Sequence, residues 1–420
     1  MTSESSPSAG NAAPGISAED RVEVDIVIFG GGVAGLWLAS RLKKQGFSLL
    51  LLEAALLGQG QTIWSQGIIH GGMKYALTGK MTTAAQSIAE MPPTWRKCLS
   101  GDAEPDLSAV EVLSDCQYLW TTGGLLSRVG AFAASKVLRA RPRPVTPDDR
   151  PAVFRDAPPD CAVYRMNEPV VATETLLRVL AADCGDCLLK YSFPQGITRE
   201  SSATGEQVIR LTDDEGNKMT ITCGCVILTA GSGNKPLCEL FDIPAVNMQV
   251  RPLHQVFARG DLPLIFGHAI NGLSDKPRLT VTSARDSQGR VVWNIGGNIA
   301  ETGIERSEKE QCEEARKELA AVLPWIDFRN VELSSGLIDR AEPAVAGGGR
   351  PDMPFVHREG NVIVAWPIKL AFAPRLHRDI CDSLSDMKLK PRAESRLPAL
   401  DWPVPGTALL PWEEEDRQWI

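Results

Sequence analysis

The stretch that decides the fold reads Val24-Asp25-Ile26-Val27-Ile28-Phe29-Gly30-Gly31-Gly32-Val33-Ala34-Gly35. It opens with apolar strand formers, and such a run ending against glycines predicts a buried parallel strand. From Val33 to Gly46, apolar residues recur at helical spacing, and the final glycine is a typical helix stop. A second apolar strand follows from Phe47 to Leu52. The segment therefore predicts the strand-helix-strand unit of a parallel sheet.

The glycines of this stretch match the pattern G-x-G-x-x-G of dinucleotide-binding proteins. Gly30 permits the tight turn, Gly32 lets a pyrophosphate lie against the backbone, and Gly35 lets the helix pack closely on the strand. At the helix start, Val33 and Ala34 present backbone N–H groups and a partial positive charge to the phosphates. The turn therefore predicts a binding site for a dinucleotide cofactor.

An acidic residue stands at the end of the second strand. Glu53 follows the glycines by about twenty residues, a position from which a carboxylate accepts hydrogen bonds from ribose hydroxyls and repels a 2′-phosphate. The alternative interpretation is a tight turn followed by a surface glutamate. The unit by itself does not distinguish FAD from NAD.

Composition and charge exclude several classes of protein. The 420 residues are 43% hydrophobic and 23% charged, which is ordinary for a globular protein of two packed domains. The net charge of −8 leaves no basic stripe for nucleic acid. No apolar run reaches the roughly eighteen residues that a membrane span requires, and no secretory signal is visible, so a cytoplasmic protein is expected. The ten cysteines, including Cys184 with Cys187 and Cys223 with Cys225, lack a zinc or thioredoxin context and are predicted to be ordinary thiols.

The order of elements predicts a chain that leaves its nucleotide-binding domain and returns to it. Residues 1–20, rich in small residues and proline, are predicted to be a disordered tail. The apolar strands predicted before Gly231 and at Val362–Trp366 resemble the buried strands of the first domain, which indicates that they belong to it. The expected division is a nucleotide-binding domain of residues 21–91, 166–245 and 331–385, a second domain of residues 92–165 and 246–330, and a C-terminal extension of residues 386–420.

The loop after the second strand carries the most specific signal. It reads Gly60-Gln61-Thr62-Ile63-Trp64-Ser65-Gln66-Gly67-Ile68-Ile69-His70-Gly71-Gly72-Met73-Lys74-Tyr75. It resembles a loop of the D-amino-acid-oxidase superfamily of flavoproteins, most closely in the glycerol-3-phosphate dehydrogenase and L-2-hydroxyglutarate dehydrogenase branch. The resemblance implies FAD as the cofactor. It also implies an α/β fold, in which a Rossmann-like, glutathione-reductase-like FAD-binding domain carries an inserted α+β domain built on a mostly antiparallel sheet.

In this family the loop runs beside the isoalloxazine ring, which implies roles for its small and polar residues. Small residues let the backbone approach a flat ring, and hydroxyl or amide groups can bond its polar edge. The resemblance thus assigns cofactor contacts to Thr62, Ser65, Gln66 and Gly67. The family histidine lies at the substrate side, so His70 is the candidate base, since imidazole titrates in a range suited to this task. A buried structural histidine is the alternative.

Two later segments resemble further cofactor-side parts of the family. Ala230 and Gly231 end a strand that approaches the cofactor. Trp366-Pro367-Ile368-Lys369-Leu370 stands where the family often has Gly-Gly-Lys-Leu-Thr, a turn that places a helix N-terminus near the pyrimidine edge of the flavin. The resemblance assigns cofactor contacts to Lys369 and Leu370, although the glycine pair is missing here.

An arginine upstream of the closing strand completes the candidate site. In the family an arginine near this point can grip a substrate carboxylate or phosphate, and the fork of Arg340 suits an anion next to the reacting carbon. A salt bridge with Asp339 or Glu342 is the alternative. Glycerol-phosphate enzymes carry arginines where this chain has Ile63–Gln66 and Lys74, so the substrate is not identified.

Together these features predict an FAD-dependent dehydrogenase or oxidase. The expected reaction passes a hydride to flavin N5 from a small polar, anionic substrate: a 2-hydroxy acid, a polyol phosphate or an amino acid. His70 would take the proton, and Arg340 would orient the anion. Oxygen, a quinone and a carrier protein are open as electron acceptors. The alternatives are a flavin monooxygenase, a non-catalytic FAD-binding or assembly protein, and a plain NAD-binding protein.

Overall fold

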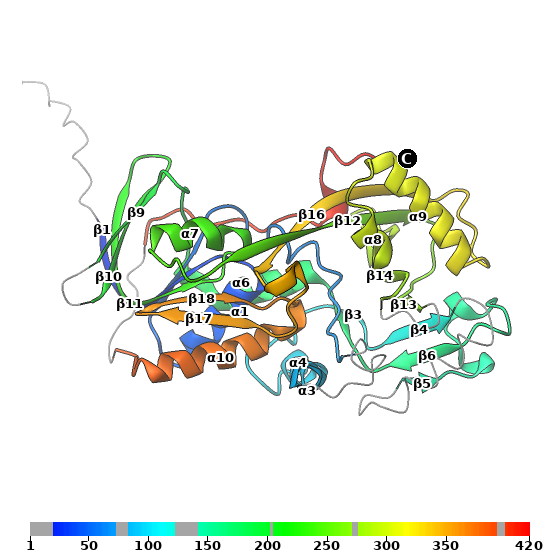
Figure 1. The fold of residues 1–420 in the computed structure, drawn as a ribbon, viewed down its shortest axis with the longest axis horizontal. Coiled ribbons are helices and arrows are strands. Elements are labelled where there is room, and N and C mark those ends of the chain that lie inside the picture. The colour runs from blue at the N-terminus through cyan, green and yellow to red at the C-terminus, as the bar shows by residue number, and fades with distance from the viewer. Residues whose placement is uncertain (1–19, 73–82, 122–141, 202–204, 271–275, 393–399) are drawn as a thin grey trace, which may run out of the picture.

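The computed structural model describes residues 20–72, 83–121, 142–201, 205–270, 276–392 and 400–420, and it builds them around two eight-stranded sheets. Figure 1 shows the two sheets in separate lobes, with the long strands β12 and β16 running from one lobe to the other. The tail expected at the N-terminus falls outside the described residues up to residue 19. Asp20, its last residue, already begins strand β1.

The first sheet has a parallel centre. Its order is β17-β18-β11-β1-β2-β8, and β10 and β9 extend it from β11. Strand β1 pairs in parallel with β11 on one side and with β2 on the other, so the carboxyl ends of these strands meet at one edge, where α/β sheets bind their ligands. The strands are β1 (Asp20–Phe29), β2 (Leu49–Glu53), β8 (Leu188–Lys190), β9 (Ile197–Ser201), β10 (Gln207–Thr212), β11 (Lys218–Leu228), β17 (Phe355–Glu359) and β18 (Val362–Trp366).

Both faces of this sheet are buried at its centre, which explains why the part of β1 from Ile26 to Phe29 is entirely apolar. Ile26 and Ile28 face a cluster of helices, whereas Val27 and Phe29 face a second cluster formed with α7 and the β9–β10 hairpin. The helices on the first face are α1 (Val33–Lys44), α3 (Thr83–Ala89), α4 (Met91–Leu99), α6 (Thr173–Cys184) and α10 (Ala373–Asp386), and α7 spans Asn234–Leu240.

The second sheet follows the order β16-β12-β15-β14-β13-β4-β6-β5. Only the pairing of β13 with β4 is parallel, so the expected mostly antiparallel sheet is confirmed, and with it the fold class. The strands are β4 (Gln117–Thr121), β5 (Arg143–Pro144), β6 (Val163–Met166), β12 (Met248–Gly260), β13 (Gly267–Ile270), β14 (Leu279–Arg285), β15 (Val291–Gly296) and β16 (Glu332–Pro343). A separate small sheet pairs β3 (Val112–Ser114) with β7 (Val170–Val171).

The two faces of the second sheet differ in chemistry. One face packs on α9 (Glu308–Val322) through an apolar cluster, and Ser307 starts this helix with a capping box; α8 (Asn298–Thr302) precedes it. Side chains alternate along a strand, so the opposite face carries the intervening residues. Several of these are buried and polar: Gln255, His268, Thr280, Thr282 and Asn294. A buried polar face suits a sheet that borders a ligand site.

The structure moves two of the expected domain boundaries. Strand β16 was assigned to the nucleotide-binding domain in residues 331–385, but it pairs along its length with β12 and belongs to the second sheet. Helix α4 was assigned to the second domain in residues 92–165, but Trp95 packs on Trp37 in the first lobe, with ring centroids 4.8 Å apart. In both cases long-range packing decides the membership of an element whose local sequence fits either domain.

The C-terminal segment packs across both lobes. Trp402 donates a hydrogen bond to the Lys190 carbonyl at 2.8 Å, and Ile420 donates to the Leu333 carbonyl at 2.8 Å. The Arg417 guanidinium lies 5.3 Å from the Trp64 ring, which belongs to the loop after β2. None of the helices in the described part of the chain combines the length and apolar character needed to cross a bilayer.

Candidate functional site

The glycine-rich turn after β1 adopts a conformation that favours glycine. Gly30 has a φ of +102°, and a Cβ atom there would lie 2.5 Å from the Ala230 Cα at the end of β11. At Gly35 a Cβ would collide with the Gly30 carbonyl oxygen. The two glycines therefore let strand, turn and helix pack without any side chain between them.

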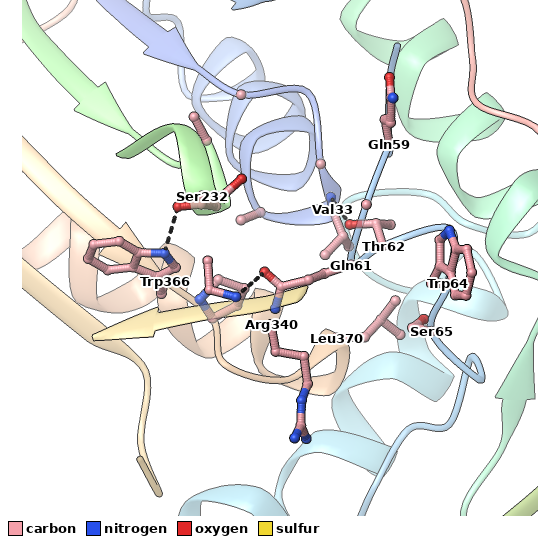
Figure 2. Close-up of a pocket in the computed structure, with 18 of the residues that line it drawn as sticks. Val33, Gln59, Gln61, Thr62, Trp64, Ser65, Ser232, Arg340, Trp366 and Leu370 are labelled. Atoms are coloured by element: carbon pink, nitrogen blue, oxygen red, sulfur yellow. Dashed lines mark hydrogen bonds between the residues drawn. The ribbon is translucent and has the colours of Figure 1, made fainter. Parts of the chain in front are cut away.

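A cavity of about 590 Å³ opens at this turn. Figure 2 shows side chains from the Gly-rich turn, the loop after β2, strand β16 and the segment after β18 around one space. All the predicted site residues except Gly35 line it: Gly30, Gly32, Val33, Ala34, Glu53, Thr62, Ser65, Gln66, Gly67, His70, Ala230, Gly231, Arg340, Lys369 and Leu370. Segments far apart in sequence thus converge on the carboxyl edge of the first sheet.

Glu53 is held rigidly at one end of the cavity. Its Oε2 accepts the Gly31 N–H at 2.6 Å, and its Oε1 accepts the Ala55 N–H at 2.8 Å. A carboxylate has further lone pairs available for a ribose, and the two backbone bonds fix its orientation before any ligand arrives. The contact of Glu53 with a ribose stays a prediction.

We expect Glu53→Gln to weaken FAD binding by about tenfold or more, because a hydrogen bond to a charged group contributes about 1.5–3 kcal/mol. The measurement is the quenching of FAD fluorescence on titration with apoprotein. The exposed Glu215→Gln is the matched control, since it removes a carboxylate far from the cavity lining. Equal FAD affinity in the two variants would exclude a ribose contact of Glu53.

The loop after β2 is tied to both lobes. The Thr62 Oγ1 accepts the Val33 N–H at 3.1 Å, at the first turn of α1. The Gln66 amide nitrogen donates to the Thr280 and Asn294 carbonyls at 2.9 and 2.8 Å, so this group is engaged by the second sheet. Gln66 therefore fixes the position of the loop, and its neighbours Ser65 and Gly67 are carried to the cavity wall.

His70 lies at the wall of the cavity beside two other titratable groups. Its Nδ1 is 3.8 Å from the Glu168 Oε2, and its ring stacks on His268 with centroids 6.2 Å apart. Burial, together with the positive charge that His70 can carry, lowers the pKa of His268 to about 3, so that His268 is neutral near pH 7. The sequence indicated His70, but Glu168 carried no signal of its own.

Arg340 has no acidic partner among the hydrogen bonds and ion pairs of the described residues. Its Nε donates to the Arg251 carbonyl at 3.1 Å, whereas the Glu342 carboxylate pairs with Arg251. The salt bridge between Arg340 and Asp339 or Glu342, considered from the sequence, is therefore not formed. Burial, then Arg251 and Arg350, lower the pKa of Arg340 to about 10, which leaves the guanidinium charged at neutral pH.

The closing turn after β18 lines the cavity, although this chain lacks the glycine pair that the family often has there. Trp366 donates its indole N–H to the Gly231 carbonyl at 3.1 Å and so joins the two cofactor-side segments (Figure 2). Ile368 has a φ of +56°, a conformation that the missing glycine would adopt freely. Lys369 then precedes a 3₁₀ turn and helix α10, which places a helix N-terminus at the cavity.

Several lining residues gave no signal in the sequence. Gln61 accepts the Ala341 N–H at 3.2 Å and thereby connects the loop to β16. Gln255 lies on the polar face of the second sheet. Further lining residues of this kind are Gln59, Tyr191, Phe193, Leu253 and Arg350.

Several other titratable residues have structural roles or lie outside the described residues. His254 is buried and its ring nitrogens contact the Gly303 carbonyl and the Ser335 hydroxyl at 2.9 and 3.0 Å. All ten cysteines are free thiols. Within the described ranges, His70, Glu168 and His268 form the one cluster spaced like metal ligands, and no cysteine belongs to it. Lys74 and Tyr75 lie outside the described residues.

A parallel sheet with a glycine cradle at its carboxyl edge, covered by the polar face of a second sheet, defines a class of dinucleotide-binding flavoproteins. The chain belongs to the DAO family of FAD-dependent oxidoreductases, whose model matches residues 25–372. It is therefore an enzyme with FAD as cofactor, and the family, fold and cofactor predicted from the sequence are confirmed.

Known relatives agree with this assignment. A probable FAD-dependent oxidoreductase of Pseudomonas aeruginosa is 41% identical over 394 residues, which cover 93% of this chain and 98% of the relative. Its crystal structure superposes with a TM-score of 0.79 at 36% identity, covering 94% of this chain and 99% of that one. The FAD-bound L-α-glycerophosphate oxidase of Mycoplasma pneumoniae has a TM-score of 0.63 at 14% identity over 90% of this chain and 99% of its own. A glycerol-3-phosphate dehydrogenase of Mycobacterium tuberculosis is 31% identical over 67 residues, 16% of this chain and 13% of the relative.

Proposed function

We propose that the protein oxidises a small anionic substrate at a carbon that carries a hydroxyl or an amino group. The observation that carries the proposal is the shared cavity, in which His70 and Arg340 stand on the walls beyond the glycine-rich turn. A 2-hydroxy acid, a polyol phosphate and an amino acid all combine an anionic end with such a carbon. FAD is the redox cofactor of the family. His70 offers a base for the proton of the substrate, and Arg340 offers a cation for its anionic end.

The residues of the cavity fit FAD. The cradle at Gly30 and Gly32 leaves room for a pyrophosphate at the N-terminus of α1, and Glu53 stands where a ribose would lie. The loop from Thr62 to Gly67 and the turn at Lys369 line the same cavity, and we propose that they border the ring. When bound, FAD accepts the hydride that leaves the substrate carbon.

His70 is proposed to take the proton of the substrate hydroxyl or amine. A general base of this kind contributes about a hundred- to ten-thousand-fold to the rate, provided that it lies within hydrogen-bonding reach of the proton. The His70 Nδ1 faces Glu168, so Nε2, which is directed away from that carboxylate, is available to the substrate. Arg340 is proposed to hold the anionic end, because its charged guanidinium forms no ion pair within the described residues and can form a bidentate pair.

A panel of substrates tests this function. Purified holoprotein is mixed anaerobically with 2-hydroxy acids, polyol phosphates and amino acids, and loss of the flavin absorbance is followed. Bleaching by one anionic class and not by its neutral analogue is the expected result. A preference for the neutral analogues would overturn the role of Arg340.

We expect Arg340→Met to raise the KM for the anionic substrate by about ten- to a hundredfold, because one charge-assisted contact worth about 1.5–3 kcal/mol is lost. The stopped-flow dependence of flavin reduction on substrate concentration gives this constant. Arg329→Met is the matched control, since Arg329 forms an exposed pair with Asp327. An unchanged KM in Arg340→Met would remove the anion contact from the proposal.

The candidate electron acceptors and the cytoplasmic location are inferred from the sequence alone and stay predictions. Oxygen, a quinone and a carrier protein are the candidate acceptors, and the rate of reoxidation with each after anaerobic reduction decides among them. The cytoplasmic location is likewise part of the proposal and is tested by cell fractionation.

A further inference from the structure

We propose that Glu168 is a positioning residue that fixes the tautomer and the orientation of His70. In this arrangement the His70 Nδ1 carries the hydrogen and faces Glu168, so the lone pair of Nε2 is presented to the substrate. The inference rests on the proposed function for its catalytic consequence. Its structural content, the tautomer of one histidine, can be measured without any substrate.

A backbone ladder holds the two residues opposite each other. Ile69 donates its N–H to the Pro169 carbonyl at 2.9 Å, and Val171 donates to the Gly67 carbonyl at 2.9 Å. Ile68 and Val170 form an antiparallel bridge between these segments. The segment before β7 therefore runs beside the cavity loop, and its register brings residue 168 to the histidine.

Glu168 is fixed more firmly than a side chain that only fills space. Its carboxylate is buried, its Oε1 accepts the Gly71 N–H at 2.7 Å, and its Oε2 accepts the Gln117 amide at 3.3 Å. A Cβ atom on Gly71 would approach this Oε1 to 3.0 Å, so the glycine after His70 permits the close contact. Two donors thus hold the carboxylate while Oε2 stays 3.8 Å from the His70 Nδ1.

The chemistry of the pair determines the tautomer. An ionised carboxylate only accepts hydrogen bonds, so the imidazole nitrogen that faces it is favoured as the one that carries hydrogen. A neutral imidazole has one N–H, which leaves the other nitrogen as a free acceptor. A small rotation of the His70 ring would shorten the 3.8 Å between its Nδ1 and the Glu168 Oε2 and complete the hydrogen bond between them.

His268 lies beside the pair of His70 and Glu168. Its Nδ1 lies 2.9 Å from the Thr280 hydroxyl, while its Nε2 is buried and has no hydrogen-bond partner among the described residues. The ring lies nearly parallel to that of His70, at an interplanar angle of 26°. Because His268 is neutral, Glu168 is the one charged group among the described contacts of His70.

The consequence for the reaction concerns where the proton rests. The substrate O–H or N–H bond breaks, its proton bonds to the His70 Nε2, and the hydrogen on the carbon leaves as a hydride to FAD. The electron pair of the broken O–H or N–H bond forms the new C=O or C=N bond. His70 is then an imidazolium, and the buried Glu168 carboxylate compensates its charge.

The direct test is the NMR spectrum of the protein with nitrogen-labelled histidine. The chain contains five histidines, so the His70 signals can be assigned by comparison with His70→Asn. We expect His70 in the wild-type holoprotein to carry its hydrogen on Nδ1. Finding it on Nε2 in the wild type overturns the proposal without any variant of Glu168.

Glu168→Gln should reverse the tautomer of His70. Its carbonyl can keep the Gly71 N–H bond, which turns the amide donor toward His70 and favours a hydrogen on Nε2. The Gln117 amide can accommodate the change by flipping, because its Oε1 has no hydrogen-bond partner among the described residues. The exposed Glu174→Gln is the control and should leave the spectrum of His70 unchanged.

The kinetic expectation is a fall in kcat of roughly a hundredfold in Glu168→Gln, with KM and FAD content unchanged, because the base is misoriented while the substrate is still held. If none of the substrate panel bleaches the flavin but the tautomer of His70 is as expected, the proposed function fails and the positioning role of Glu168 stands. A normal kcat in a Glu168→Gln variant with the reversed tautomer would overturn the catalytic part.

A divalent metal is the competing explanation of the cluster. The three ligand atoms lie within 4.8 Å of one another, and His268 offers a buried nitrogen that no group in the described ranges bonds. The purified protein is therefore examined for stoichiometric metal by elemental analysis. Metal that is lost both in His268→Ala and in Glu168→Gln would show that Glu168 is a ligand, and the positioning proposal would be wrong. Absence of bound metal, including after incubation with Zn²⁺ or Co²⁺, supports it.

Discussion

Replacing His70 with asparagine is expected to slow reduction of the bound flavin by about a hundred- to ten-thousand-fold while FAD stays bound. The physical reason is that asparagine keeps a polar group at the cavity wall but cannot accept a proton at neutral pH. The FAD contacts expected from the glycine turn and Glu53 lie on other segments, so cofactor content should be unchanged. Anaerobic stopped-flow absorbance with the best substrate of the panel measures the rate.

His357→Asn is the matched control for this experiment, because His357 lies on β17 beside Glu359 and does not line the cavity. Imidazole added to His70→Gly should restore part of the lost rate by entering the space of the deleted ring. Wild-type reduction rates in His70→Asn would show that another group takes the proton.

Gly30→Val is expected to yield colourless protein that unfolds at a lower temperature. The φ of +102° disfavours any L side chain, and the new Cβ would meet the Ala230 Cα at 2.5 Å, where two backbones cannot separate without moving β1 from β11. We expect a loss of about 3 kcal/mol or more in the free energy of unfolding, as strain and overpacking act together. The ratio of flavin to protein absorbance and a thermal melt measure the two effects.

The variant Gly216→Val separates the effect of backbone strain from the effect of overpacking. Gly216 has a φ of +88°, but a Cβ atom there meets no atom within 4 Å. This control should lose only the smaller contribution of backbone strain, about 1–3 kcal/mol, and should remain yellow. A yellow Gly30→Val protein with the same melting temperature as Gly216→Val would contradict a crowded cofactor cradle at Gly30.

The sequence by itself determined the features that depend on neighbours along the chain. The strand before Gly30, the glycine spacing and the acid at Glu53 belong to one continuous βαβ unit, whose geometry follows from local backbone rules. The loop through His70 could be recognised for the same reason, because its small residues and its histidine lie within one short segment. These signals sufficed for the family, the fold class and the cofactor.

Only the tertiary structure decided which distant groups meet. Arg340 could have paired with Glu342 on its own strand, but the neighbouring strand brings Arg251 to that acid and leaves the Arg340 guanidinium to the cavity. Glu168 reaches His70 because two segments about a hundred residues apart pair as a ladder, with the Gly71 N–H bonded to the Glu168 carboxylate. Strand β16 joined the second sheet through its register with β12. Such pairings are set by the packing of the whole chain, and no local pattern encodes them.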